Sequence, residues 1–134
     1  MIKFSELKTG DFVMAEYEGQ AYEGEVVNLN GDEKQVCISD GAREFWFNTE
    51  DLKPILLDDA QLLRMNFQKQ ENEDGTVKYM KGVFRMMIPA KDNFSHFEIW
   101  YRDEKRQIMH PISVHQLQNH YLDMTKVHLT SDPV

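Results

Sequence analysis

The sequence contains a single cysteine and no long apolar run, and both absences narrow its class. Because Cys37 has no partner in the chain, no intramolecular disulfide can form. No apolar run approaches the roughly 18 residues that are needed to cross a bilayer. The first residues carry lysines and a glutamate where a secretion signal needs a continuous apolar stretch. We therefore expect a protein that stays in the cytoplasm and has no membrane partner.

Several catalytic and metal-binding motifs are also absent from the sequence. There is no Gly-x-Ser-x-Gly nucleophile motif, no phosphate-binding loop and no Gly-x-Gly-x-x-Gly dinucleotide motif. His110, His115 and His120 are spaced by five, which scatters the rings around a helix, whereas zinc-binding helices place two histidines four apart. Cys37 lies in a short apolar segment, where cysteine usually acts as a small buried hydrophobe. We therefore expect a protein that is not an enzyme and that binds no metal or cofactor.

The net charge of −8 is located almost wholly in the first half of the chain. Residues 1–57 carry twelve acidic and five basic side chains, a net charge of −7, whereas residues 58–134 carry eleven and ten, a net charge of −1. Nucleic acids are bound largely through lysine and arginine at the phosphates, so residues 1–57 should not bind DNA or RNA directly. A basic peptide is a better electrostatic match, although acidity also keeps a small domain soluble.

The first half shows the pattern of an all-β domain, with short apolar strands at regular intervals and turn signals between them. Glu18-Gly19 and Asp40-Gly41 are suited to tight turns, and Asn30-Gly31 is a pair that readily adopts positive φ angles. This pattern predicts a five-stranded barrel over residues 1–57. The expected strands are residues 11–17, 22–29, 35–39, 43–47 and 53–57.

The second half predicts two helices and a small antiparallel sheet. Asp58 and Gln61 have the spacing of a capping box, and Ser113 and Gln116 repeat this spacing before the last helix. Polar residues 68–76 predict a loop or the tip of a hairpin, and charged residues 103–106 predict a hairpin loop. The expected strands are residues 94–102, residues 107–112 and residues 77–88, the last as one strand with a bulge at Gly82 or as two short strands. The chain is therefore predicted to be α+β, a barrel of residues 1–57 followed by a helix–sheet–helix domain of residues 58–134.

A set of spaced residues runs through the strands expected in the first half and the turns between them. They are Gly10, Asp11, Val13, Ala15 and Tyr17, then Ala21, Tyr22, Gly24 and Val26, then Asp40 and Gly41, and finally Glu50, Asp51, Leu52, Lys53 and Pro54. In order and spacing, this set resembles the Tudor family within the Src-homology-3-like barrels. The resemblance implies a barrel fold and, in those members that read methylated side chains, a cage of aromatic rings that holds a cation.

The resemblance places two tyrosines of this chain at cage positions of the Tudor family. These are Tyr17 and Tyr22, whereas the usual aromatic positions on the third strand and its turn are occupied by Ile38 and Gly41. Trp46 on the fourth strand would replace one missing ring if it faced the same side. The alternative is that both tyrosines only pack the rim of the barrel, since fold does not determine function.

The last predicted helix opens with a distinctive string, Val114-His115-Gln116-Leu117-Gln118-Asn119. Together with an earlier apolar pattern at Ile55, Leu57, Leu62, Leu63 and Phe67, it resembles an uncharacterised protein family of gut anaerobes and their mobile elements. That resemblance spans nearly the whole chain. It implies no particular activity, because the family has none assigned.

The spacing of apolar residues in this helix predicts which side is buried. Val114, Leu117 and Tyr121 share one face, so we expect Gln118 and Asn119 to point away from the core, with His115 nearby. Such amides would form a contact surface for a partner or for a second copy of the chain. Two alternatives stay open. The amides are simply solvated, or they tie down the preceding loop by bonding its backbone.

The leading functional hypothesis is a non-enzymatic module that binds a protein partner. Its candidate binding residues are Tyr17, Tyr22 and Trp46 in the first half and His115, Gln118 and Asn119 in the second. The alternative is an accessory protein of a phage or mobile element that is associated with nucleic acid through a basic protein partner.

The charge distribution makes one testable prediction without any structure. Because residues 1–57 carry a net charge of −7, they should repel duplex DNA and show no salt-sensitive binding. Titration of residues 1–57 alone with duplex DNA at low salt checks this. Micromolar affinity for the DNA that weakens as salt is added would contradict it.

Overall fold

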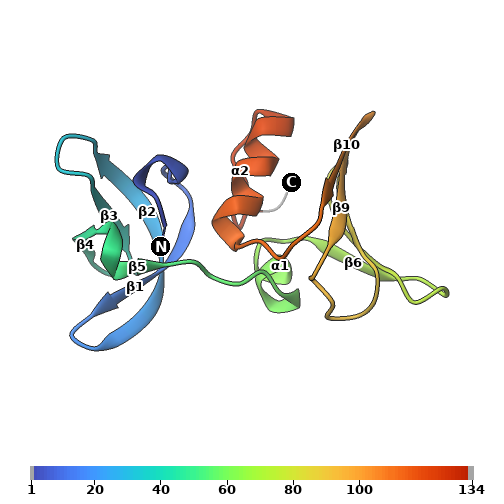
Figure 1. Ribbon diagram of the computed structural model, residues 1–134, viewed down its shortest axis with the longest axis horizontal. Coiled ribbons are helices and arrows are strands. Elements are labelled where there is room, and N and C mark those ends of the chain that lie inside the picture. The colour runs from blue at the N-terminus through green and yellow to red at the C-terminus, as the bar shows by residue number, and fades with distance from the viewer. Residues whose placement is uncertain (1, 133–134) are drawn as a thin grey trace. The chain divides into compact units, whose positions relative to one another are not determined.

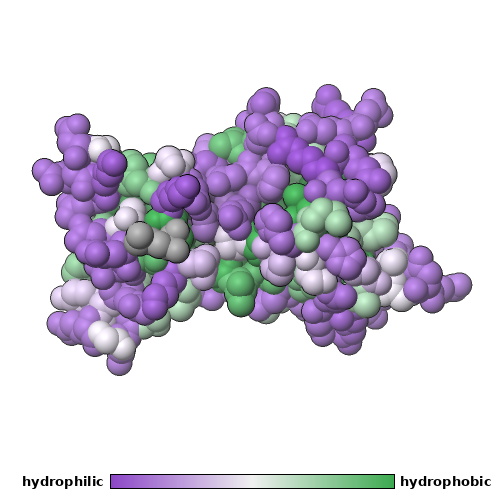
Figure 2. All heavy atoms as spheres, in the orientation of Figure 1, coloured by the Kyte–Doolittle hydropathy of each residue, from purple (hydrophilic) through white to green (hydrophobic). Residues whose placement is uncertain are grey.

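The computed structural model describes residues 2–132, which form two compact units (Figure 1). The first unit contains the chain up to Ile55 together with Ser113–Asn119, and the second contains Leu56–Ile112 and the chain from His120 onward. Each unit has an antiparallel sheet of five strands, and with its helices the fold is α+β, as the sequence predicts. Within residues 2–132, no helix is long and apolar enough to span a membrane. Hydrophilic side chains predominate on the face that Figure 2 shows.

The strands of the first unit form one sheet in the order β4-β3-β2-β1-β5. No helix interrupts residues 11–47, which agrees with the sequence prediction. The last strand pairs with β1 and is shorter than expected. It ends at Lys53 because the next residue, Pro54, has no N–H to donate. Among the described residues β4 and β5 do not pair, so the sheet is open and the predicted closed barrel is not confirmed. The elements are η1 (Phe4–Glu6), β1 (Phe12–Tyr17), β2 (Gln20–Asn30), β3 (Gln35–Ser39), β4 (Glu44–Asn48), η2 (Thr49–Asp51) and β5 (Leu52–Lys53).

Local sequence explains two features of this sheet. Between β1 and β2, Glu18 and Gly19 have φ angles of 52° and 77°, and a turn with two positive φ angles matches the twist of paired strands. In β2, a Cβ on Gly24 would lie only 2.3 Å from the Cγ2 of Ile38. The close approach of β2 to β3 therefore requires glycine at this position.

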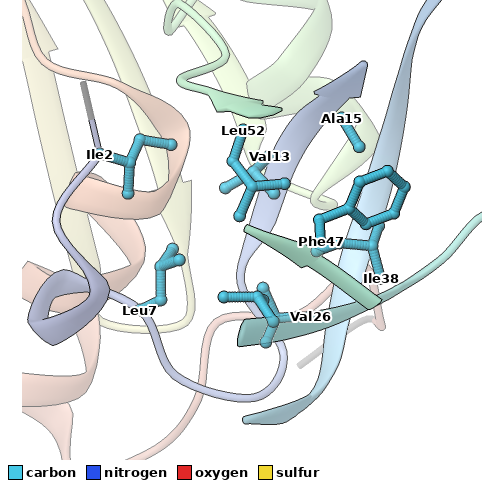
Figure 3. Close-up of a cluster of buried hydrophobic side chains, with 9 residues drawn as sticks. Ile2, Leu7, Val13, Ala15, Val26, Ile38, Phe47 and Leu52 are labelled. Carbon is cyan, nitrogen blue, oxygen red and sulfur yellow. The ribbon is translucent and has the colours of Figure 1, made fainter. Parts of the chain in front are cut away.

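The core of the first unit consists of apolar side chains from one face of the sheet and from the segment before β1 (Figure 3). Alternation along β1 turns Val13 and Ala15 inward, and each is fully buried. Burying a large aliphatic or aromatic side chain contributes about 1.5–3 kcal/mol, so this cluster stabilises the first unit substantially. Its members are Ile2, Leu7, Val13, Ala15, Val26, Val36, Ile38, Phe47 and Leu52.

The second unit contains a sheet in which each strand pairs with its neighbour in sequence, in the order β10-β9-β8-β7-β6. Residues 77–88 form two strands, and Gly82, with a φ angle of 61°, lies in the turn between them. Helix α2 spans Val114–Thr125, of which the residues from His120 belong to this unit. The other elements are α1 (Asp59–Arg64), β6 (Gln68–Glu71), β7 (Val77–Lys81), β8 (Phe84–Ile88), β9 (Phe97–Tyr101) and β10 (Glu104–Ile108).

Two hairpin loops in this unit are shorter than the sequence predicts. Residues 68–71 form β6 rather than a loop, because a strand at the edge of a sheet can be polar on both faces and needs no apolar alternation. Residues 104–106 belong to β10, because the turn from β9 takes only Arg102 and Asp103. Arg102 accommodates this tight turn with a φ angle of 55°.

Helix α1 is capped by Asp58 and bonded to the sheet through its first residue, Asp59. The side chain of Asp58 accepts a hydrogen bond from the backbone N–H of Gln61 at 2.9 Å, which confirms the predicted N-cap. The Oδ1 of Asp59 accepts hydrogen bonds from the hydroxyl of Tyr79, at 2.6 Å, and from the Nζ of Lys69, at 2.9 Å. The hydrogen bond from Tyr79, followed by that from Lys69, lowers the pKa of Asp59 below its ordinary value.

This carboxylate makes stability depend on pH. A carboxyl whose pKa is lower in the folded state stabilises the protein above its unfolded pKa of 3.8, and this contribution is lost as the pH falls through the folded pKa. We expect Asp59→Asn to reduce the free energy of unfolding by about 1 kcal/mol at pH 7. Below about pH 4, the free energies of unfolding of the variant and the wild type should become more similar. Thermal melts across this range test it, with the exposed Asp32→Asn as the control, and a difference that is the same at about pH 3 and at pH 7 would refute it.

Candidate functional site

Two polar side chains at the start of α2, Gln118 and His115, are buried, and for Gln118 this is contrary to the sequence prediction, whereas Asn119 is half-buried. Gln118 has no exposed surface and His115 is only 1% exposed. The side-chain Nε2 of Gln118 donates to the carbonyl oxygen of Gly10 at 2.9 Å, and its Oε1 accepts from the backbone N–H of Phe12 at 2.8 Å. One amide therefore bonds the chain on both sides of Asp11. The prediction that Gln118 points away from the core is wrong, because the apolar face of a helix does not indicate what the adjacent face contacts.

The neighbouring polar side chains bond the same segment. The Nδ2 of Asn119 donates to the carbonyl oxygen of Glu6 at 3.0 Å, and its Oδ1 accepts from the Nζ of Lys8 at 2.8 Å. The Nε2 of His115 lies 3.0 Å from a carboxylate oxygen of Glu6. These contacts fit one of the alternatives that the sequence left open, in which the side chains hold a loop in place by bonding its backbone. The loop in question is the one before β1, rather than the one before α2.

A buried ion pair lies within the same segment. Asp11 has no exposed surface, and its carboxylate is paired with the ammonium of Lys8 and accepts the backbone N–H of that residue at 3.1 Å. Burial raises the pKa of Asp11, because a charged carboxylate loses hydration there, and Lys8 opposes the shift by hydrogen bonding and by its charge. Lys8 thus connects Asp11 with Asn119, and the segment before β1 is held by both charges and amides.

One row of polar side chains resembles the hydroxyl–imidazole–carboxylate arrangement of a catalytic triad. It consists of Ser113, His115 and Glu6. The Oγ of Ser113 lies 3.0 Å from the Nδ1 of His115, whose other ring nitrogen faces Glu6. However, Ser113 is only 5% exposed, and its Oγ also donates to the Oε1 of Gln116 at 3.1 Å. That Oε1 accepts the backbone N–H of Ser113 at 2.9 Å, which is the contact expected of the predicted capping box. A nucleophile must reach a substrate, so we interpret this row as a helix cap.

The aromatic residues of the first unit do form a cluster, although its members differ from those predicted. The ring of Tyr17 stacks on Phe45, with ring centres 5.4 Å apart and planes inclined by 14°. Phe47 lies beneath, with its ring centre 6.5 Å from that of Tyr17 and 6.4 Å from that of Tyr22. We call Tyr17, Tyr22, Phe45 and Phe47 the aromatic rim. Sequence reasoning missed the two phenylalanines, although their spacing of two along β4 places them on one face.

The other positions singled out for a cage lie elsewhere. Trp46 alternates with Phe45 and Phe47 along β4, so it lies on the opposite face of the strand. Ile38 is fully buried in the core, and Gly41 is exposed in the turn before β4 with a φ angle of 96°. Trp46 therefore does not replace a ring of the rim, because the condition for it, a shared face, is not met. Both Tyr17 and Trp46 are 47% exposed, on different faces of the same sheet.

A cation and a carboxylate lie beside the aromatic rim. The guanidinium of Arg43 lies over Phe45, 5.3 Å from the ring centre, and 4.0 Å from the carboxylate of Asp40. Partial burial raises the pKa of Tyr22, and the charge of Asp40 adds to that effect. The backbone N–H groups of Ala42 and Arg43 bond Asp40 and lower its pKa, so this carboxylate is ionised at neutral pH. A cation over an aromatic ring beside a fixed carboxylate is a favourable arrangement.

Metal ligation finds no support in the part of the chain that the structure describes. Across residues 2–132, no three side chains among the His, Cys, Asp and Glu residues are grouped so as to hold an ion. Cys37 is buried, and burial raises the pKa of its thiol, which disfavours the reactive thiolate.

The burial of Gln118 predicts a large loss of stability when its amide is removed. Gln118→Ala deprives the carbonyl of Gly10 and the N–H of Phe12 of this partner inside the first unit, so we expect a loss of about 2–4 kcal/mol. Denaturant unfolding of the full chain measures it, with the exposed Gln20→Ala as a control that should change stability by less than about 0.5 kcal/mol. Equal losses for the two variants would contradict the assignment.

Comparisons with protein-family models, with curated proteins and with solved structures found no match to this chain. The functional conclusion must therefore come from the side chains themselves. The polar string of α2 is accounted for by its structural bonds, whereas the aromatic rim combines partial exposure with charge. The aromatic rim is the candidate functional site.

Proposed function

We propose that this protein is a non-enzymatic binding module whose first unit has a Tudor-like fold and binds a basic segment of a partner protein. The observation that carries the proposal is the half-exposed ring of Tyr17, stacked on Phe45 within a unit of strongly negative charge. The five antiparallel strands, of which the first four lie close to the ranges predicted from the strand pattern, support the finer part of the proposal.

Electrostatics favours a cationic ligand at this rim. Residues 1–57 carry seven more acidic than basic side chains, so a basic segment is attracted over several ångströms before contact. At contact, a lysine or arginine of the partner would lie against the exposed face of Tyr17, as Arg43 lies over Phe45 within the protein. The negative charge of Asp40, which acts on Tyr22 of the same rim, adds to the attraction. The partner's own contribution is one or two cationic side chains on an extended segment.

A nucleic-acid-associated role would use the same surface. An acidic module of this kind reaches DNA or RNA only through a basic protein that carries its own phosphate contacts. The two functions therefore differ in the identity of the partner and not in the binding chemistry of the rim.

Matched variants of the full chain test the rim. We expect a short, fluorescent Gly–Ser peptide with several arginines to bind the wild type, and the same peptide with glutamates in place of arginines not to bind. Tyr17→Ala should weaken binding about fivefold, because an exposed cation–π contact is worth about 1 kcal/mol. Trp46→Ala removes an equally exposed ring from the opposite face and should change nothing.

Fluorescence anisotropy measures these affinities, and thermal melts show that each variant is folded. Binding should weaken as salt is added, because the attraction is screened. Three results would each sink the proposal. They are equal binding of the two peptides, a larger effect of Trp46→Ala than of Tyr17→Ala, and no measurable binding of the basic peptide at low salt.

A further inference from the structure

The sheet of the second unit has one buried face and one open face. Alternation turns Tyr79, Phe84, Met86 and Ile99 inward, and Phe84 contacts Phe67 and Tyr121, whose ring centres lie 6.1 and 4.7 Å from its own. The other face carries side chains that are partly or fully exposed. We call it the open face, and its members are Lys78, Met80, Arg85, Met87, Glu98, Trp100, Lys105 and Gln107.

The strand register places an aromatic ring between two cations on the open face. Arg85 and Lys105 are the direct cross-strand neighbours of Trp100, and their charged groups lie 5.7 and 5.0 Å from the centre of the indole ring. In the next row, Lys78 is opposite Met87. A hollow of about 170 Å³ is lined by Lys78, Arg85, Met87 and Trp100.

Two of these cations have no carboxylate partner. Lys105 forms an ion pair with Glu98 at 3.3 Å, whereas neither Lys78 nor Arg85 makes an ion pair within residues 2–132. Both side chains line the hollow. The net charge of the chain is −8. Unpaired positive charge on such an acidic protein, beside an indole and a thioether, is suited to a carboxylate that arrives from another molecule.

A second hollow adjoins the first and is mainly apolar. It has a volume of about 250 Å³ and shares Met87 with the first hollow. Pro89, Ile108 and Met109 contribute its apolar wall, and Met109 is 71% exposed. Methionine side chains adapt their shape to an incoming apolar group. Each hollow is smaller than the roughly 300–1,000 Å³ typical of small-molecule sites, so each suits a single side chain.

We propose that the open face binds an acidic segment of another protein. One aspartate or glutamate of that segment lies between Lys78 and Arg85, where the guanidinium bonds its carboxylate with two parallel hydrogen bonds. An apolar side chain close by in the segment occupies the hollow at Met87 and Met109. The site is independent of the aromatic rim, which has the opposite charge preference.

Single-stranded nucleic acid is the competing anionic ligand, and the geometry disfavours it. Bases stack on exposed aromatic faces, yet both neighbours of the Trp100 ring are cations already in contact with it. Glu98 lies on the same face, and residues 58–134 have a net charge of −1. Two unpaired cations serve one carboxylate well, but they are too few for a backbone that carries a phosphate on every nucleotide.

Selection from a random peptide display library against the full, immobilised chain identifies the preferred ligand. The expected result is a motif with one aspartate or glutamate and a nearby leucine, isoleucine, phenylalanine or methionine. Failure to enrich any motif, or a motif without an acidic residue, would overturn the proposal.

Affinities of the selected peptide then test the assigned side chains. Arg85→Gln and Lys78→Gln should each weaken binding about tenfold, and Lys91→Gln, which removes an exposed charge of the same unit outside both hollows, should not. Met109→Ser should weaken it about threefold through the apolar hollow. Because these side chains are at least partly exposed, the variants should melt as the wild type does.

Two further arms separate this site from its alternatives. Tyr17→Ala should leave affinity for the acidic peptide unchanged, so failure of the aromatic rim and failure of the open face are distinguishable. Oligothymidylate should neither bind nor compete. Equal effects of Arg85→Gln and Lys91→Gln, or oligothymidylate binding that Arg85→Gln abolishes, would refute the proposal.

Discussion

The first unit depends on one buried amide. Gln118 offers a donor and an acceptor at the same time, and the chain at Gly10 and Phe12 offers the complementary carbonyl and N–H. The first of these contacts is partly buried and the second is buried, so the backbone groups are satisfied at least partly away from water. Around this amide, Asn119 and His115 add contacts to Glu6 and Lys8, so the segment before β1 takes one path. That path positions Ile2 and Leu7 over the core and starts β1 in register.

The two units differ in how they arrange charge. In the first unit, acidic residues are in excess and the aromatic rim has a cation-accepting character, with Asp40 ionised beside Tyr22. In the second, acidic and basic residues nearly balance, yet most of the bases on β6, β7 and β10 are already engaged. Lys69 and Arg106 are paired with Asp59 and Asp123, and the ammonium of Lys81 donates to two backbone carbonyls. Lys78 and Arg85 therefore remain available to an anionic ligand, although the net charge of the unit does not indicate this.

Local chemistry made much of the fold predictable, and non-local bonding explains what was not. The Glu18-Gly19 turn and the Asp58 cap were found because each depends on residues close together in sequence. Gln118 was misplaced because its partners lie more than a hundred residues away and leave no mark on the periodicity of the helix. Edge strand β6 lacks alternation because it has a single partner strand, and therefore nothing in Gln68–Glu71 distinguished it from a loop. The aromatic rim was half predicted: alternation pairs Phe45 with Phe47, but a single strand cannot tell which of its faces meets Tyr17.

The composition of the first unit also constrains when it can fold. Its sheet is complete once Lys53 has been synthesised, yet Ser113–Asn119 are part of the same unit and come much later in the chain. On the ribosome, the segment before β1 must therefore wait until residues 56–112 have emerged before Gln118 can reach it. Closing so long a loop costs entropy that only the final contacts offset, which slows the last step. Until then the segment before β1 lacks these bonds, and the strongly negative charge of residues 1–57 disfavours association with similar chains.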